Sequence, residues 1–120
     1  MKRIAAVLGV VLFAGGPLAA QEAAAAPDSV TITGQVVDVT CYTLKGASGA
    51  AHKQCAQACA DKGMTLGILS NGTIYIPLGT GDTPNTKLRE FAESQVKVTG
   101  MHRLKNGVHT LEVRSVSAAS

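Results

Sequence analysis

The sequence predicts a small β-rich domain of the α+β class, built as a five-stranded barrel. Five short runs rich in apolar and β-branched residues are separated by turn signals, as in strands of a small barrel. Two Asn-Gly pairs, Asn71-Gly72 and Asn106-Gly107, fall between such runs and predict tight β-hairpins. The segment between the third and fourth runs has helical spacing instead, so we expect two hairpins linked by a helix.

The individual elements follow in chain order. The predicted strands are residues 31–39, 64–70, 73–78, 96–104 and 108–116. Within the first strand, Gly34 and the Val36-Val37 doublet predict a bend or bulge that shifts the alternation of side chains. After the third strand, Thr83-Pro84 or Asn85 opens a short helix, and its apolar face is Leu88, Phe91 and Ala92.

This order of elements resembles that of the OB-fold, a small Greek-key barrel with a helix between its third and fourth strands. The resemblance extends from about residue 30 to about residue 118. It lies in the order of elements and in segments such as Thr31-Ile-Thr-Gly-Gln-Val-Val-Asp and Val96-Lys-Val-Thr-Gly. It implies an OB-like Greek-key barrel, with an open α+β sandwich of the same elements as the alternative.

The segment between the first two strands holds every cysteine of the chain. Ser48 or Gly49 can begin a helix that ends at Gly63. At helical spacing, His52, Cys55 and Cys59 fall within an arc of about 60°. We therefore expect these three side chains to face the protein, where Cys41 at the end of the first strand would meet them.

The pattern Cys41…His52-x-x-Cys55-x-x-x-Cys59, followed by Gly63 and a strand, resembles small exported bacterial OB-fold-like proteins of uncharacterised function. The resemblance covers most of the chain that follows the signal peptide. It implies that the Cys/His group is a family feature, and it implies no activity.

The Cys/His group allows three interpretations. As a metal site, Cys41, His52, Cys55 and Cys59 form a Cys3His set for zinc or copper, with Asp38 orienting the imidazole. As a staple, Cys41 pairs with Cys55 or Cys59 in an exported interaction module and leaves one spare thiol. In the third interpretation, Cys55 and Cys59 cycle between thiol and disulfide.

The N-terminus predicts export. Lys2 and Arg3 precede an uncharged apolar run, and Leu18-Ala19-Ala20 offers small residues for cleavage before Gln21. We expect residues 1–20 to be a signal peptide, residues 21–28 a flexible arm and residues 29–120 a single OB-like domain in the bacterial periplasm. The apolar run is too short to cross a bilayer, so no membrane anchor is expected after cleavage.

Composition and motifs argue against several classes of function. Loss of Lys2 and Arg3 leaves nine basic residues against eight acidic ones, so little draws the domain to nucleic acid. Aromatic residues make up 3% of the chain, too few for base-stacking platforms. Neither a nucleophile–base arrangement nor a close carboxylate pair is evident. The sequence thus predicts a binding protein rather than an enzyme, with a metal ion and a periplasmic partner protein as candidate ligands.

Two further histidines lie on the second predicted hairpin. With a two-residue turn at Asn106-Gly107, His109 sits opposite Leu104 and diagonal to His102, on one face of the hairpin. The pair either packs at an end of the barrel or forms a second, weaker metal site.

Overall fold

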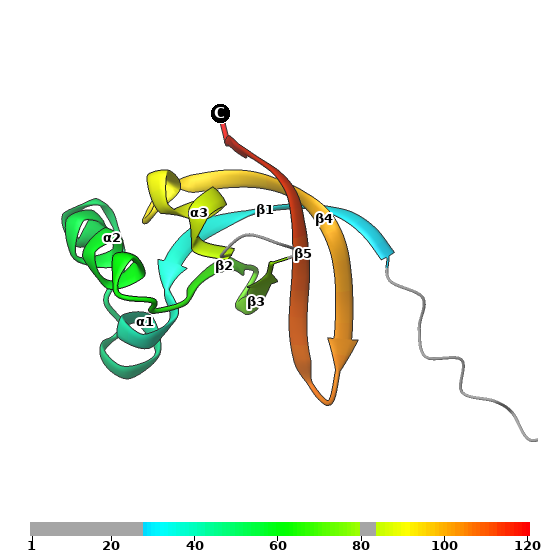
Figure 1. The fold of residues 1–120 in the computed structure, drawn as a ribbon, viewed down its shortest axis with the longest axis horizontal. Helices are drawn as coiled ribbons and strands as arrows, with labels where there is room; N and C mark the ends of the chain where they lie inside the picture. The colour runs from blue at the N-terminus through cyan, green and yellow to red at the C-terminus, as the bar shows by residue number, and fades with distance from the viewer. Residues whose placement is uncertain (1–27, 80–83) are drawn as a thin grey trace, which may run out of the picture.

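The computed structural model describes residues 28–79 and 84–120 (Figure 1). The expected signal peptide and residues 21–27 of the expected arm lie outside the described residues. Asp28, which the sequence assigned to the arm, is already the first residue of a strand. Within the described ranges, no helix is both long enough and apolar enough to cross a membrane.

Five strands close into a barrel in the order β1-β2-β3-β5-β4. The strands are β1 Asp28–Asp38, β2 Leu66–Ser70, β3 Thr73–Leu78, β4 Gln95–Lys105 and β5 Val108–Ala118. The helices are α1 Val39–Lys45, α2 Lys53–Asp61 and α3 Pro84–Leu88, with 3-10 turns η1 Ala50–His52 and η2 Arg89–Phe91. β3 and β5 pair in parallel, while the other pairs are antiparallel. This topology confirms the OB-like Greek-key barrel and excludes the open sandwich.

Both predicted hairpins form at their Asn-Gly turns. Asn71 and Gly72 have φ angles of 49° and 76°, and Asn106 and Gly107 have 51° and 79°. Two successive positive φ angles define the type I′ turn, whose twist matches that of the flanking strands. Asn and Gly adopt this backbone region most readily, so the turns fix the register of both hairpins.

Two strands approach each other closely at a glycine of β1. β1 pairs with β4 up to Gln35 and with β2 from Gln35 to Asp38, so Gly34 lies at the crossing. A Cβ atom on Gly34 would lie 2.4 Å from the carbonyl oxygen of Leu69. The pairing through this part of β1 is continuous, and a register shift falls instead between Thr99 and Gly100 in the β4–β5 pair. The expected bulge in β1 is therefore a close approach without a shift.

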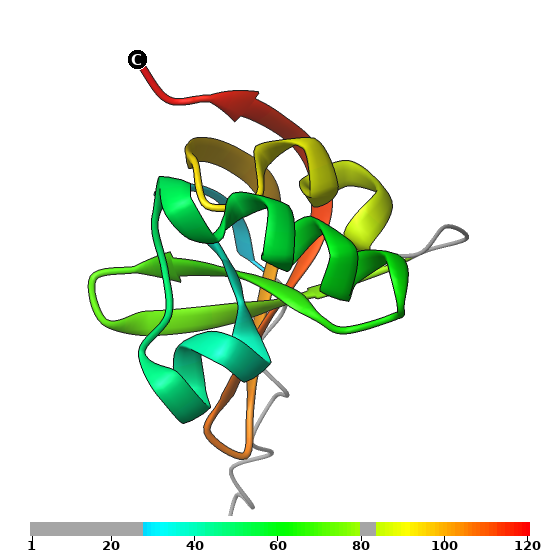
Figure 2. The same ribbon diagram turned by 90° about the vertical axis from the view of Figure 1, so that its left-hand side faces the viewer.

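The two ends of the barrel are closed differently. The helices gather at one end, while the β4–β5 hairpin projects away from them (Figures 1 and 2). At the helical end the apolar core contains Ala56 and Ala60 of α2, together with Leu88 and Ala92. At the hairpin end, His102 and Tyr75 stand opposite the buried residues Leu111 and Ile68. Residues opposite each other in an antiparallel pair share a face, so His102 and Tyr75 lie on the inner face of the barrel.

Candidate metal centre

A short helix directly after β1 places Cys41. The Asp38 side chain caps α1, accepting a hydrogen bond of 2.9 Å at Oδ1 from the backbone N–H of Cys41. The helix ends at Gly46, whose φ of 64° lets its N–H reach the carbonyl oxygen of Tyr42. Cys41 is therefore in the first turn of a helix, and its predicted place at the end of the strand was wrong. The β-branched residues Val39 and Thr40 favour a strand, but the Asp38 side chain caps a helix that begins at Val39.

Helix α2 places the other two cysteines, and its register differs from the predicted one. The buried residues of α2 are Ala56 and Ala60, whereas Cys55 is exposed and Cys59 is half-buried. The stripe that faces the protein is thus centred on the alanines, and the expectation that Cys55 faces inward was wrong. After α2, the N–H groups of Lys62 and Met64 both reach the carbonyl oxygen of Cys59, which confirms a helix stop at this point.

Three potential ligands converge where β1, α1 and α2 meet. One ligand atom each from Asp38, Cys41 and Cys59 lies within 4.8 Å of the other two. Asp38 is fully buried, and both thiols are half-buried. While Oδ1 of Asp38 caps α1, Oδ2 is buried without a hydrogen-bond partner among the described residues. The side-chain donor that reaches this carboxylate is the weak Cys59 thiol, which leaves a buried charge poorly compensated, and a cation at this point would bind it more strongly.

The electrostatics of the site centre on Cys59. Burial, the Asp38 carboxylate and the Cys55 thiol, in that order, raise the pKa of the Cys59 thiol to about 11. Without a cation, this thiol therefore keeps its proton at neutral pH. Cys55 is close enough to contribute to the shift, so it borders the three-residue group on its solvent side.

His52 belongs to a different cluster. Its Nδ1 lies 2.9 Å from Oε1 of Glu93, whose side chain is fully buried. The other carboxylate oxygen of Glu93 accepts hydrogen bonds from the N–H of Gly49 at 2.7 Å and from Nε2 of Gln35 at 3.1 Å. The residue that orients the imidazole is thus Glu93, where the sequence suggested Asp38. This network ties η1 to β1 and holds His52 outside the group of three.

The structure therefore brings together two of the four predicted ligands. Cys41 and Cys59 meet, Cys55 borders them, and His52 bonds elsewhere. The sequence pattern did not point to Asp38 as a potential ligand in its own right, nor to Glu93. The sequence could have predicted the place of Asp38, because Asp is a preferred helix N-cap and accepts a hydrogen bond from the N–H three residues later, here that of Cys41. The place of Glu93 could not be predicted in this way, because its contacts join residues far apart in the chain.

The spacing of the group suits a tetrahedral ion after a small adjustment. With Zn–S bonds near 2.3 Å and Zn–O bonds near 2.1 Å, ligand atoms on one zinc lie about 3.5–3.8 Å apart. The ligand atoms of Asp38, Cys41 and Cys59 lie within 4.8 Å of one another, so each pair must approach by at most roughly 1 Å to reach these separations. Side-chain rotation can supply a movement of this size. Two thiolates and a carboxylate suit zinc better than Cu(I), because Cu(I) prefers sulfur and nitrogen to hard oxygen.

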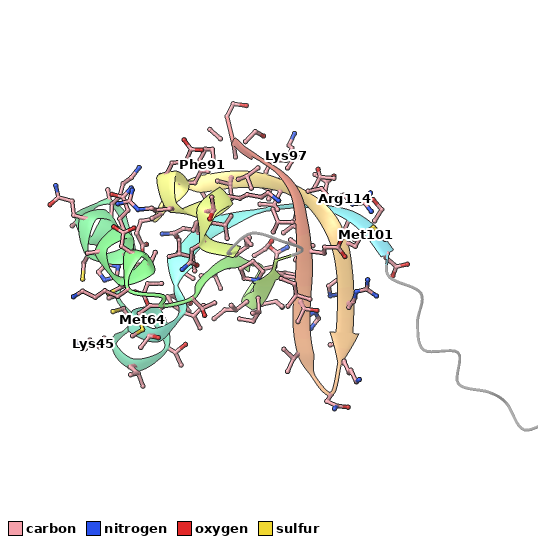
Figure 3. The ribbon with its side chains drawn as sticks, in the orientation of Figure 1. Lys45, Met64, Phe91, Lys97, Met101 and Arg114 are labelled. Atoms are coloured by element: carbon pink, nitrogen blue, oxygen red, sulfur yellow. The ribbon has the colours of Figure 1, made fainter. Side chains whose placement is uncertain are left out.

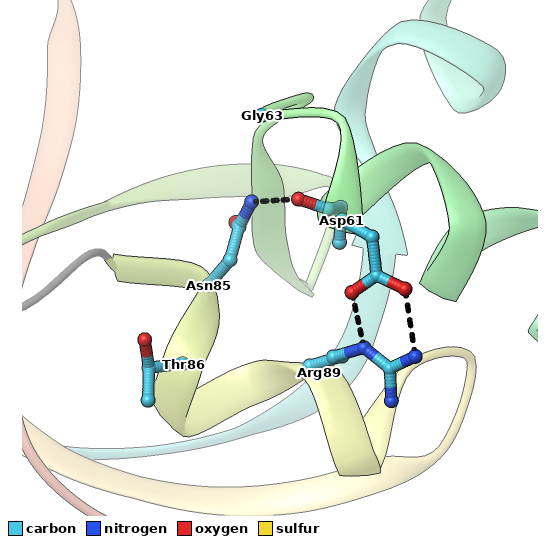
Figure 4. A pocket seen from close by; sticks show the side chains of 6 residues that line it. Asp61, Gly63, Asn85, Thr86 and Arg89 are labelled. Atoms are coloured by element: carbon cyan, nitrogen blue, oxygen red, sulfur yellow. Dashed lines mark hydrogen bonds and ion pairs between the residues drawn. The ribbon is translucent and has the colours of Figure 1, made fainter.

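A separate open pocket of about 290 Å³ lies at the C-terminal end of α2 (Figure 4). Asp61 and Arg89 form a double hydrogen bond across it, so the two charges on its wall neutralise each other. Asn85 accepts from the N–H of Leu66 and donates to the carbonyl oxygens of Ala60 and Met64. These contacts hold the loop between α2 and β2. None of the pocket residues belongs to the group of Asp38, Cys41 and Cys59, which we call the thiol group.

The surface beside α1 is partly apolar. Leu44 is 76% exposed and Met64 is 40% exposed. Figure 3 labels Met64 and Lys45, and in this view both lie toward the end of the molecule where α1 is found.

Comparisons with protein-family models, curated protein sequences and solved structures gave no significant match. The fold that the structure establishes is the five-stranded mixed barrel with its helices. The functional interpretation accordingly starts from the geometry of Asp38, Cys41 and Cys59.

Proposed function

We propose that this chain is an exported metal-binding protein whose centre uses Asp38, Cys41 and Cys59 to hold zinc. The observation that carries the proposal is the buried, unpartnered Oδ2 of Asp38 beside two thiols. Both thiols lose their protons when they bind a metal, and a divalent cation offsets the repulsion between these thiolates and the Asp38 carboxylate. Cys55 is placed to supply a fourth ligand from the solvent side; otherwise water completes the coordination.

The proposed role is storage, sensing or delivery of the ion to a periplasmic partner protein, rather than catalysis. The exported location rests on the N-terminal signal pattern, and copper is the alternative ion. With Asp38 in the ligand set, zinc becomes the better candidate of the two.

A second function is favoured by one observation. The Cys41 and Cys59 sulfurs lie within 4.8 Å of each other, so oxidation could join them as a staple between α1 and α2. All three cysteines are free thiols in the structure. The alternative is therefore an interaction module with one Cys41–Cys59 disulfide and Cys55 as its spare thiol.

Cobalt titration of the reduced mature chain separates these functions. Co²⁺ is a spectroscopic substitute for zinc, and its thiolate charge-transfer absorption reports sulfur ligands directly. We expect one equivalent to give this absorption and Cys59→Ser to lower the affinity at least about 100-fold. Asp38→Asn keeps an acceptor for the helix cap and should cost about tenfold or more.

His52→Gln is the matched control, because His52 lies on the same segment but bonds to Glu93. We expect its cobalt affinity to stay within about threefold of wild type. A loss as large as that of Cys59→Ser would instead support the Cys3His set. Absence of thiolate absorption in the reduced wild-type chain would refute the metal centre and leave the disulfide module.

A further inference from the structure

We infer a second metal site, independent of the thiols, at the opposite end of the barrel. Nε2 of His102 and Nδ1 of His109 lie 3.0 Å apart, close enough for one divalent ion of the Cu²⁺ or Ni²⁺ type to bind both. The two residues come from neighbouring strands, β4 and β5, and the Asn106-Gly107 turn fixes their diagonal placement.

The ring geometry identifies this contact as edge to edge. The ring planes differ by 13° and the centroids are 5.2 Å apart, a pair of values that offset-stacked rings can also have. The centroid separation is close to the nitrogen–nitrogen distance plus two ring radii, so the nitrogens face each other nearly in the ring planes. The gap between them accommodates a single shared proton in the metal-free pair.

The separation also matches that of two imidazoles on one ion. With metal–nitrogen bonds of 2.0–2.1 Å, two ligands at 90° are about 2.9 Å apart and tetrahedral ligands about 3.3 Å. The observed 3.0 Å is an ordinary hydrogen-bond distance, and it lies within about 0.3 Å of both values, so the two nitrogens need little change in separation to share an ion. To bind one ion, each imidazole must turn its lone pair roughly 45° away from the line that joins the two nitrogens. The imidazole that donates the N–H must also move this proton to its other ring nitrogen.

The surroundings hold the pair in place and leave it accessible. Tyr75 packs edge-on against both imidazoles, with centroid distances of 5.4 Å to each ring. Both histidines are half-buried, so the remaining coordination positions open toward water.

The two sites are far enough apart to act independently. Asp28, paired with His102, begins β1, and Asp38 of the thiol group ends it. Ten residues of strand span up to about 33 Å. Failure of either site therefore leaves the other unaffected, and a residue-resolved measurement distinguishes them.

Substoichiometric Ni²⁺ added to the ¹⁵N-labelled mature chain provides the test, because paramagnetic Ni²⁺ broadens amide signals near its binding site. We expect broadening at residues 101–103 and 108–110, whether or not signals near Cys41 and Cys59 also broaden. His109→Gln should abolish the hairpin broadening, while His52→Gln, which alters the third histidine of the chain, should leave it unchanged.

Two results would overturn the second site. One is a wild-type spectrum in which Ni²⁺ leaves the hairpin signals sharp, a result that needs no variant and does not depend on whether a variant folds. The other is persistence of hairpin broadening in a folded His109→Gln protein.

Discussion

At the residue scale, the three cysteines differ because each has a different neighbour. Cys59 lies against the Asp38 carboxylate, Cys41 is in the first turn of a helix that Asp38 caps, and Cys55 points to solvent. One aspartate thus organises two thiols by capping α1 with one oxygen and facing the sulfurs with the other.

The first prediction concerns alkylation of the metal-free, reduced chain. Because the raised pKa keeps Cys59 protonated and Cys59 is half-buried, it should react with iodoacetamide at pH 8 at least about tenfold more slowly than exposed Cys55. Peptide mass spectrometry of timed samples gives the individual rates. Equal rates at the two positions would contradict the described environment of Cys59.

The second prediction follows from the same pKa. A thiol whose pKa is raised on folding stabilises the folded state below the unfolded-state value of 9.0, and this contribution disappears as the pH rises toward 11. The melting temperature of the metal-free wild type relative to Cys59→Ser should therefore be highest below pH 9 and decrease between pH 9 and pH 11. A difference that does not change with pH would contradict the assignment.

The sequence identified the right segment for the site but only part of the ligand set. Cys41 and Cys59 were predicted to meet, and they do. His52 was assigned to the cysteine group by helical spacing alone. Spacing cannot reveal that Glu93, 41 residues later in the chain, binds the imidazole instead. Tertiary hydrogen bonds of this kind decide which ligand a helix face contributes.

At the element scale, the hairpins were the easiest elements to predict and α1 the hardest. The Asn-Gly pairs encode type I′ turns locally, so β3 was predicted residue by residue at 73–78 and the other strands of the hairpins closely. Helix α1 spans only seven residues, begins with β-branched side chains and depends on one cap. A local pattern of this kind is too weak to separate a short helix from a continuing strand.

The third prediction concerns the connection from α2 to β2. Asn85 makes three hydrogen bonds to backbone groups there, so Asn85→Ala should lower the free energy of unfolding by about 1–3 kcal/mol. Urea denaturation of the metal-free protein measures the change.

Gln57→Ala is the control for this prediction, because the half-buried Gln57 side chain donates one solvent-exposed hydrogen bond to the Arg89 carbonyl oxygen. Its effect should be about 0.5 kcal/mol or less. Equal effects of the two substitutions would show that Asn85 does not secure the connection.

At the scale of the whole molecule, the barrel separates the two sites. The thiol group sits at the helical end, where three elements meet, and the histidine pair sits at the hairpin end on the inner face. The order of strands was predictable because local turns and strand lengths restrict a small barrel to few topologies. The inner-face position of His102 and His109 depends on barrel closure as well as on the local turn.

The fourth prediction concerns stability in the presence of zinc. An ion that binds only the folded chain at 100 times its Kd adds about 2.7 kcal/mol, which raises the melting temperature of a domain this size by roughly 10 °C or more. Because a tenfold weaker affinity leaves about 1.4 kcal/mol, Asp38→Asn should lose about half of that increase or more. His109→Gln leaves the thiol centre intact and should keep the increase. Equal increases in Asp38→Asn and wild type would place the zinc elsewhere.

The most direct test of the central claim is native mass spectrometry of the chain without residues 1–20, purified without chelator, with thiols counted on the same sample. A zinc centre on Asp38, Cys41 and Cys59 predicts one bound zinc per chain and three free thiols after its removal. It also predicts loss of the zinc in Asp38→Asn. A mass lowered by one disulfide, with a single free thiol and no metal uptake after reduction, would contradict the claim.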